Sequence, residues 1–181
     1  MTSDIPRAGG LLLACFLLCT LAQNAAWAQH RRDPLNPLEV DEVREAALDA
    51  DKRIKLYVKF ARERLEALEQ MRADPKVTDR ARQTRSRLQD FLDVYDELNE
   101  NIDNFADRKD DLRKPLKAVI EADTEFQAKL RALKTSAEVN KNEIEQYRVL
   151  LANALDTLDS SAQDHRELLG EQEKAPPRKK Y

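Results

Sequence analysis

Apolar residues recur at every third or fourth position from Ala81 to Phe105, and charged or amide side chains mostly separate them. This spacing gathers the apolar side chains on one side of an α-helix, as in a long helix that packs against another. We call such a row of apolar positions a seam. The core seam of this segment contains Leu88, Phe91, Tyr95, Leu98, Ile102 and Phe105. Other segments carry similar seams, and no stretch alternates as a β-strand does, so the pattern predicts an all-α protein.

The seams and the helix-boundary residues predict an elongated antiparallel bundle or coiled coil over residues 37–170. We expect four helical segments, at about 37–72, 75–107, 111–134 and 140–169. Asn36, with proline next and Glu39 at the third helical position, is a suitable N-cap for the first segment. Asp74 and the proline after it are expected to open the second segment, and Gly170 is expected to end the last.

The junction around Pro115 has two interpretations. In one, the chain reverses, with Asp110 or Asp111 as N-cap and Pro115 in the first turn of the third helix. In the other, the second helix continues through a kink at Pro115, which leaves three helices instead of four. We favour the reversal, because it lets the two halves bury their seams on each other.

Residues 1–28 are predicted to be a cleaved signal peptide. An apolar run from Leu11 to Ala22 precedes an Ala-x-Ala site that ends at Ala28. The run is short for a bilayer span, which argues against the alternative of an uncleaved anchor. Both cysteines, Cys15 and Cys19, would be removed, so no disulfide is expected. We therefore expect export to a bacterial periplasm or secretion.

The ends of the mature chain are polar. Residues 29–36 are expected to be disordered, and residues 171–181 are expected to form a flexible basic tail that contains Arg178, Lys179 and Lys180.

No motif for catalysis, a cofactor or a metal is recognisable, so we assign no such residues and expect a protein that is not an enzyme. His165 is the only histidine of the helical region and lacks the Glu-x-x-His spacing of bundle metal sites. We expect it at a solvated edge. Asp123 falls on the third seam. A solvated edge is its simpler expectation, since acidic residues are seldom fully buried, and a hydrogen bond to a seam tyrosine is the alternative.

Charge is unevenly distributed along the second segment. It begins with four arginines and ends with acidic residues, which opposes the helix dipole. If the first two helices pair antiparallel, the acidic start of the first lies beside this acidic end. The candidate interaction surface consists of Asp93, Asp96, Glu97, Glu100 and Asp103.

These features favour a non-enzymatic exported bundle that acts through protein contacts as a scaffold, adaptor or chaperone-like factor. Self-association is equally compatible, because matched seams can be buried within one chain or between chains. The alternatives are a bundle that binds lipid or the envelope surface, disfavoured by narrow apolar stripes, and a bundle that binds a small ligand or calcium. Nucleic acid is not expected, because the chain carries a net charge of −3 and a signal peptide.

Overall fold

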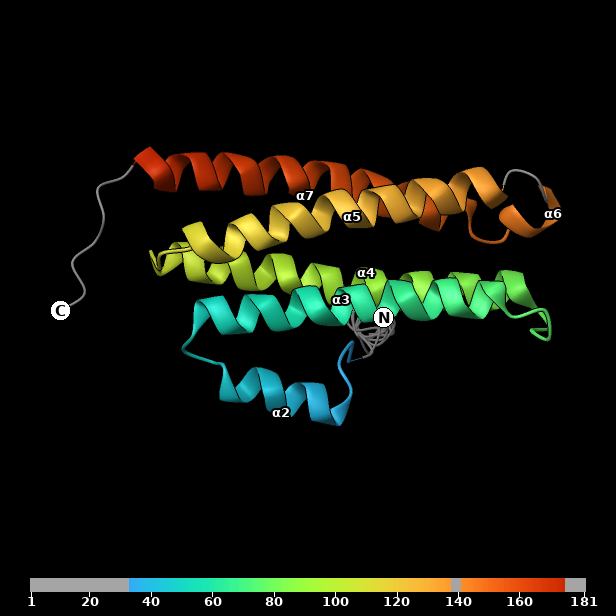
Figure 1. Ribbon diagram of the computed structural model, residues 1–181, viewed down its shortest axis with the longest axis horizontal. Helices are drawn as coiled ribbons and strands as arrows, with labels where there is room; N and C mark the ends of the chain where they lie inside the picture. The colour runs from blue at the N-terminus through green and yellow to red at the C-terminus, as the bar shows by residue number, and fades with distance from the viewer. Residues whose placement is uncertain (1–32, 138–140, 175–181) are drawn as a thin grey trace, which may run out of the picture. The chain divides into compact units, whose positions relative to one another are not determined.

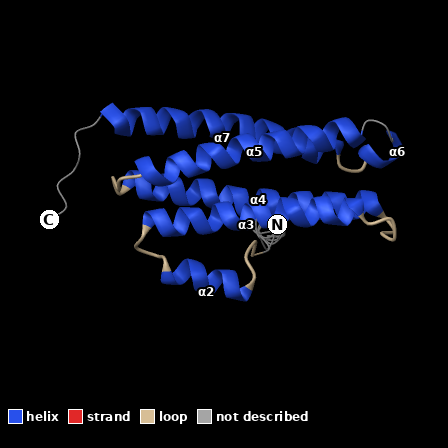
Figure 2. Cartoon of the chain, viewed as in Figure 1, coloured by secondary structure: helices blue, strands red, loops and turns tan. Residues whose placement is uncertain are grey.

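The computed structural model describes residues 33–137 and 141–174, and these contain helices and loops but no strand (Figure 1, Figure 2). The chain is an all-α helical bundle. Its helices belong to the compact unit Pro34–Tyr181. They are α2 (Pro37–Glu45), α3 (Ala50–Ala73), α4 (Arg80–Asp107), α5 (Arg113–Ala137), α6 (Lys141–Ile144) and α7 (Arg148–Lys174). The predicted signal peptide, residues 29–32 and residues 175–181 lie outside the described residues. The predicted disorder is wrong for residues 34–36, because Arg64 binds the Pro34 carbonyl and Asn36 caps α2, and the predicted flexible tail is wrong for residues 171–174, which belong to α7.

The four long helices form two antiparallel pairs. Helix α3 packs on α4, and α5 packs on α7. The pairs join through contacts of α3 with α5 and of α4 with α7, which places α4 and α5 at opposite corners of the bundle. Successive long helices reverse direction, so α3 runs parallel to α5 and α4 runs parallel to α7 (Figure 1). The short helix α2 packs beside the first half of α3 (Figure 1).

The core lies where the seams of the four long helices meet. All six core-seam residues of α4 are buried, and Leu98 is fully inaccessible. The seams of the other helices are buried beside them, through Ile54 and Ala61 of α3, Phe126 of α5 and Leu158 of α7. Phe91 and Phe126 meet edge to face with ring centroids 5.5 Å apart, which locks α4 to α5 across the diagonal.

The chain reverses between α4 and α5, as the favoured interpretation of Pro115 predicted, and the kinked alternative is wrong. Lys109 has a positive φ of 63°, and its amide donates to the Ala106 carbonyl at 2.7 Å. The Asp110 amide donates to the Phe105 carbonyl at 3.0 Å. This arrangement ends α4 much as a glycine cap would. Pro115 lies in the first turn of α5, where its missing amide hydrogen costs nothing.

The first predicted helix, over 37–72, is wrong in one respect, because the chain forms two helices there. Asn36 caps α2 as expected, with a reciprocal bond to Glu39. The chain then turns at residues 46–49, and the Asp49 side chain accepts a hydrogen bond from the Lys52 amide to cap α3. The turn lets α2 fold back onto α3 and bury Val43 and Ala46, which a straight helix would leave without partners.

The predicted segment 140–169 is also wrong in one respect, because it contains two helices, α6 and α7, separated by a turn at residues 145–147 in which the Tyr147 amide donates to the Ile144 carbonyl at 3.0 Å. Further boundaries differ from the prediction. Helix α4 begins at Arg80 rather than at Pro75, because Asp74 accepts from the Lys76 amide in a turn instead of capping a helix. Helix α7 continues past Gly170 to Lys174. The Gln172 side chain accepts from the Leu112 amide at 2.7 Å and donates to the Asp110 carbonyl at 3.1 Å. These bonds hold the last turn in place and outweigh the weak helix propensity of one glycine.

Truncation of the core seam should cost far more stability than truncation of an exposed leucine. Leu98→Ala should lower the free energy of unfolding by about 2–5 kcal/mol, because a cavity would remain at a fully buried position. Leu48→Ala is the matched control, since Leu48 is 87% exposed, and it should change stability by less than about 0.5 kcal/mol. Urea unfolding followed by circular dichroism measures both, and equal effects would contradict this packing.

Candidate functional site

A buried polar triad joins three helices in the middle of the bundle. Asp123 of α5 is fully buried. The Tyr95 hydroxyl of α4 donates to Asp123 Oδ1 at 2.7 Å, and His165 Nδ1 of α7 lies 2.9 Å from Asp123 Oδ2. The predicted solvated edge is therefore wrong for Asp123 and for His165, and the alternative of a tyrosine partner for Asp123 is confirmed. Both carboxylate oxygens are satisfied, which makes this burial tolerable.

The triad holds its phenol in the protonated form. Burial raises the pKa of the Tyr95 hydroxyl well above its usual range, and the neighbouring Asp123 carboxylate raises the pKa further. Tyr95 is thus a permanent hydrogen-bond donor. The contacts bind α4, α5 and α7 at one level, so a slip of one helix would leave buried polar atoms without partners.

A second polar cluster closes the end of the bundle where α3 meets α4 and α6. Arg72 of α3 pairs with Glu143 of α6 and donates to the Thr84 hydroxyl of α4 at 2.9 Å. Its guanidinium also lies over the Tyr147 ring, 5.9 Å from the ring centroid. One arginine therefore ties together three helices and the turn before α7.

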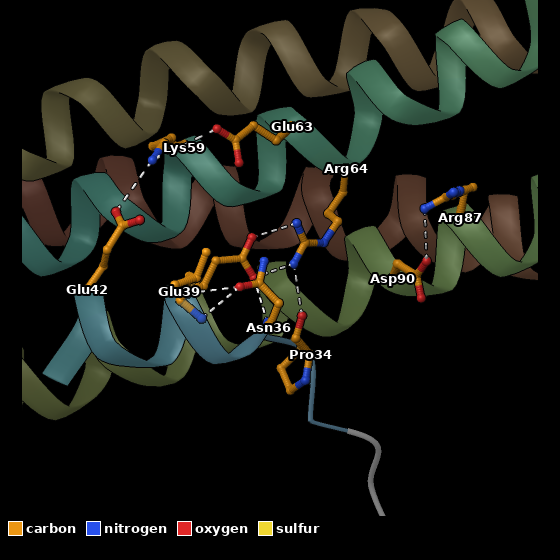
Figure 3. Close-up of polar contacts among 10 residues, drawn as sticks. Pro34, Asn36, Glu39, Glu42, Lys59, Glu63, Arg64, Arg87 and Asp90 are labelled. Atoms are coloured by element: carbon orange, nitrogen blue, oxygen red, sulfur yellow. Dashed lines mark hydrogen bonds and ion pairs between the residues drawn. The ribbon is translucent and has the colours of Figure 1, made fainter.

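A third cluster fixes α2 on α3 (Figure 3). Arg64 of α3 donates two hydrogen bonds to the Glu39 carboxylate, from Nη1 to Oε1 at 2.8 Å and from Nη2 to Oε2 at 2.6 Å. Arg64 also donates to the Pro34 carbonyl at 3.1 Å, and the Asn36 amide donates to Glu39 at 2.8 Å. Burial would raise the pKa of Glu39, but the bonds from Arg64 and Asn36 outweigh burial and lower that pKa below its ordinary value.

The other end of α2 is held by Arg53. Its Nε donates to the Asn101 side chain of α4 at 2.6 Å, and its Nη1 donates to the Val43 carbonyl at 3.2 Å. The Asn101 side chain in turn donates to the Glu97 carbonyl at 2.7 Å. Arg53 therefore connects α2, α3 and α4, and satisfies a carbonyl at the C-terminal end of α2.

The predicted interaction surface lies along one helix, on the side of α4 turned away from its seam. We call this set the acidic face: Asp93, Asp96, Glu97, Glu100 and Asp103. Glu100 and Asp103 are exposed, and the other three are half-buried. Asp93 accepts a hydrogen bond from Gln89 at 2.8 Å. The acidic start of α2 does not simply extend this face, because Arg64 and Lys59 pair with Glu39 and Glu42.

A shallow groove of about 280 Å³ lies between α3 and α5. Its floor includes Leu65, Leu68, Leu130 and Leu133, all of which are already buried, so little apolar surface remains for a ligand. Within residues 33–137 and 141–174, no group of three or more His, Cys, Asp or Glu side chains is placed to hold a metal ion.

Sequence reasoning placed the acidic residues together on one helix, but it missed the three arginines that organise the polar clusters. Arg53, Arg64 and Arg72 read as ordinary charged residues of an exposed helix surface. Their partners lie from 10 to 75 residues away in the chain. Only the position of each arginine beside the α3 seam gave a signal, since a long side chain there can reach a neighbouring helix.

Removal of the Asp123 carboxylate should strongly destabilise the bundle. Asp123→Ala should lower the free energy of unfolding by about 2–4 kcal/mol, since Tyr95 and His165 would lose a buried partner. Asp159→Ala, which removes only the exposed ion pair with Arg131, should cost less than about 1 kcal/mol. Thermal and urea unfolding test this expectation, and an unchanged melting temperature for Asp123→Ala would refute the role of the triad.

The Glu39–Arg64 pair should make stability depend on acid pH. Because the folded state lowers the pKa of Glu39 from 4.5, the pair stabilises the fold above pH 4.5 and loses this effect as the pH falls through the lowered pKa. Arg64→Met should therefore be less stable than the wild type at pH 6, and the gap should narrow toward pH 3. Urea unfolding across this range measures the gap, and a gap independent of pH would contradict the assignment.

The comparisons with known proteins supply no family for this chain. No protein-family model matches the sequence, and neither a curated protein nor a solved structure gives a significant match. A helical bundle by itself carries no function. The function must therefore be argued from the surfaces and polar clusters of the bundle.

Proposed function

We propose that this protein is a non-enzymatic exported adaptor that binds a positively charged segment of a partner protein along the acidic face of α4. The observation that carries the proposal is the charge order of α4. Seven acidic residues and no basic residue lie between Asp90 and Asp107. A surface of one sign attracts an oppositely charged partner and raises its association rate.

This charge order works against the stability of α4. A helix favours acidic residues in its first turn and basic residues in its last, whereas α4 has neither. Each unfavourably placed charge near a helix end costs about 0.3–1 kcal/mol at low ionic strength. The residues that bear this cost are Arg80 and Arg82 in the first turn and Asp107 in the last turn, because the effect fades within one turn of a helix end.

The acidic face also has rigid support. On one flank, Asn101 of α4 is bound by Arg53 of α3. On the other flank, the Asn99 side chain donates to the Ser161 hydroxyl of α7 at 3.0 Å. A charged surface on a helix fixed from both sides loses little conformational entropy when a partner binds, which favours affinity.

The exposed apolar surface favours a protein partner over a lipid surface. Among the described residues, the large hydrophobic side chains with high exposure are Leu38, Leu48 and Val149. They lie at the start of α2, in the turn before α3 and at the start of α7, so no single helix presents the broad apolar face of a membrane-surface helix. Among the residues that the structure describes, no helix has the length and the apolar character to cross a membrane.

Neutralisation of the acidic face should abolish partner binding. The test variant combines Asp93→Asn, Asp96→Asn, Glu97→Gln and Glu100→Gln. Crosslinking in the native cell envelope, followed by mass spectrometry, should recover one or two discrete partners with the wild type. The test variant should recover them at least fivefold less, and high salt should weaken recovery from the wild type.

The control variant makes the same change in net charge at exposed positions outside the acidic face. It combines Glu66→Gln, Glu121→Gln, Glu145→Gln and Asp156→Asn. It should recover the partners as well as the wild type does. Equal recovery by all three proteins, or self-crosslinks alone, would refute an adaptor role for the acidic face.

A further inference from the structure

Helix α2 packs on α3, and Arg53 of α3 links it to α4 by binding both the Val43 carbonyl and Asn101. Phe60 and Val94 lie beside the seams rather than on them, yet both are buried. Phe60 shares its flank of α3 with Arg53 and Arg64, the two arginines that bind α2. Val94 shares its flank of α4 with Asn101, which Arg53 also binds. The same flanks therefore form a helix-binding groove, which α2 occupies.

Few apolar contacts hold α2 in this groove. Val43 is the buried apolar residue of α2, Val40 is half-buried, Ala46 is buried in the turn that follows, and Leu38 is largely exposed. The other contacts are polar, chiefly the Glu39–Arg64 pair and the bond from Arg53 to the Val43 carbonyl. A short helix held in this way contributes modestly to stability, so it can leave its groove without unfolding the bundle.

The turn that folds α2 back is close to a helix in sequence and in conformation. Its residues, Ala-Ala-Leu-Asp at 46–49, include three strong helix formers and contain neither glycine nor proline. Ala46 has φ −92° and ψ 12°, near the helical region. Asp49 is extended, with φ −107° and ψ 96°. At Asp49, ψ must rotate toward helical values if α2 and α3 are to join into one helix.

The contacts between α2 and α3 have a register that two chains can share. Glu39 meets Arg64 and Glu42 meets Lys59, so a residue early in α2 meets one late in α3. In each pair, the midpoint between the two residue numbers lies close to residue 51. Two straight helices laid antiparallel with this register are related by a twofold axis near that residue, beside the small side chains of Ala47 and Ala50. In such a dimer, α2 of each chain would make with the partner chain every contact that it now makes within its own chain.

We propose that a second copy of this chain supplies its α2 to the groove, which produces a reciprocal, domain-swapped dimer with one continuous helix from Pro37 to Ala73. The exchange keeps the Glu39–Arg64 pair and the bond of Arg53 to the Val43 carbonyl, but makes them between chains. It removes the turn at 46–49 and its Asp49 cap, and adds helical hydrogen bonds across that turn. Because the contacts are the same, the two forms differ mainly in the turn and in the entropy of association.

Charge exchange at one ion pair tests the proposal. E39R places two positive charges at this pair, and R64E places two negative charges there, so neither variant can seat its own α2 well. When the two are refolded together, the swapped heterodimer alone restores an opposite-charge pair at both grooves. Native mass spectrometry should show the heterodimer at least tenfold more abundant than either homodimer. A mixture that stays monomeric, as each variant does alone, would overturn the proposal.

Three further variants distinguish exchange of α2 from simple attraction between charged surfaces. The double variant E39R/R64E restores the pair within one chain, so it should be folded and should not enrich heterodimers with the wild type. A47G/L48G in both mixed copies should weaken the heterodimer at least tenfold, because glycine disfavours a helix across the turn. D49A should strengthen it, because the cap that favours the turn is lost. A heterodimer whose abundance is unchanged by the A47G/L48G and D49A substitutions would overturn the proposed exchange.

Discussion

Each long helix of this protein buries its apolar seam only because the other three helices are present. An isolated amphipathic helix is marginally stable in water, and most helical stability in proteins comes from tertiary packing. Helix α3 meets α4 and α5, and α7 meets the same two helices from the opposite corner. The loss of one helix would expose the seams of two neighbours. The polar clusters and the attachment of α2 to α3 depend on this packing, because it brings their partners together from different helices.

Polar contacts decide how the seams fit together. Leucine seams alone tolerate several registers, because one apolar contact can replace another. The carboxylate of Asp123 has no such freedom, since it must meet Tyr95 and His165 at the same time. Arg72 imposes the same kind of condition at the end of the bundle. A helix that slipped by one turn would bury polar atoms without partners, which is costly in a core that excludes water.

The two proposed surfaces require different mechanical properties of the bundle. The acidic face needs rigidity, and the contacts of Asn99 and Asn101 fix α4 from both sides. The groove under α2 needs a helix that can be exchanged, and the polar attachment of α2 suits that need. Helix α4 contributes to both surfaces, with its acidic residues facing away from the core and Val94 facing the groove. One rigid helix therefore supports a fixed surface and an exchangeable one.

Local signals in the sequence determined the helical class, the residues of the α4 core seam and the cap at Asn36, but they left the reversal before Pro115 as the favoured one of two interpretations. Helix periodicity and capping depend on residues a few positions apart, so they can be recognised without a structure. Tertiary structure decided the turn at residues 46–49, the continuation of α7 past Gly170 and the burial of Asp123. Each of these depends on a partner distant in the chain: the arginines of α3 for α2, Leu112 for Gln172, and Tyr95 with His165 for Asp123. Only the folded bundle brings such partners together, and their contacts outweigh the local preferences of the chain.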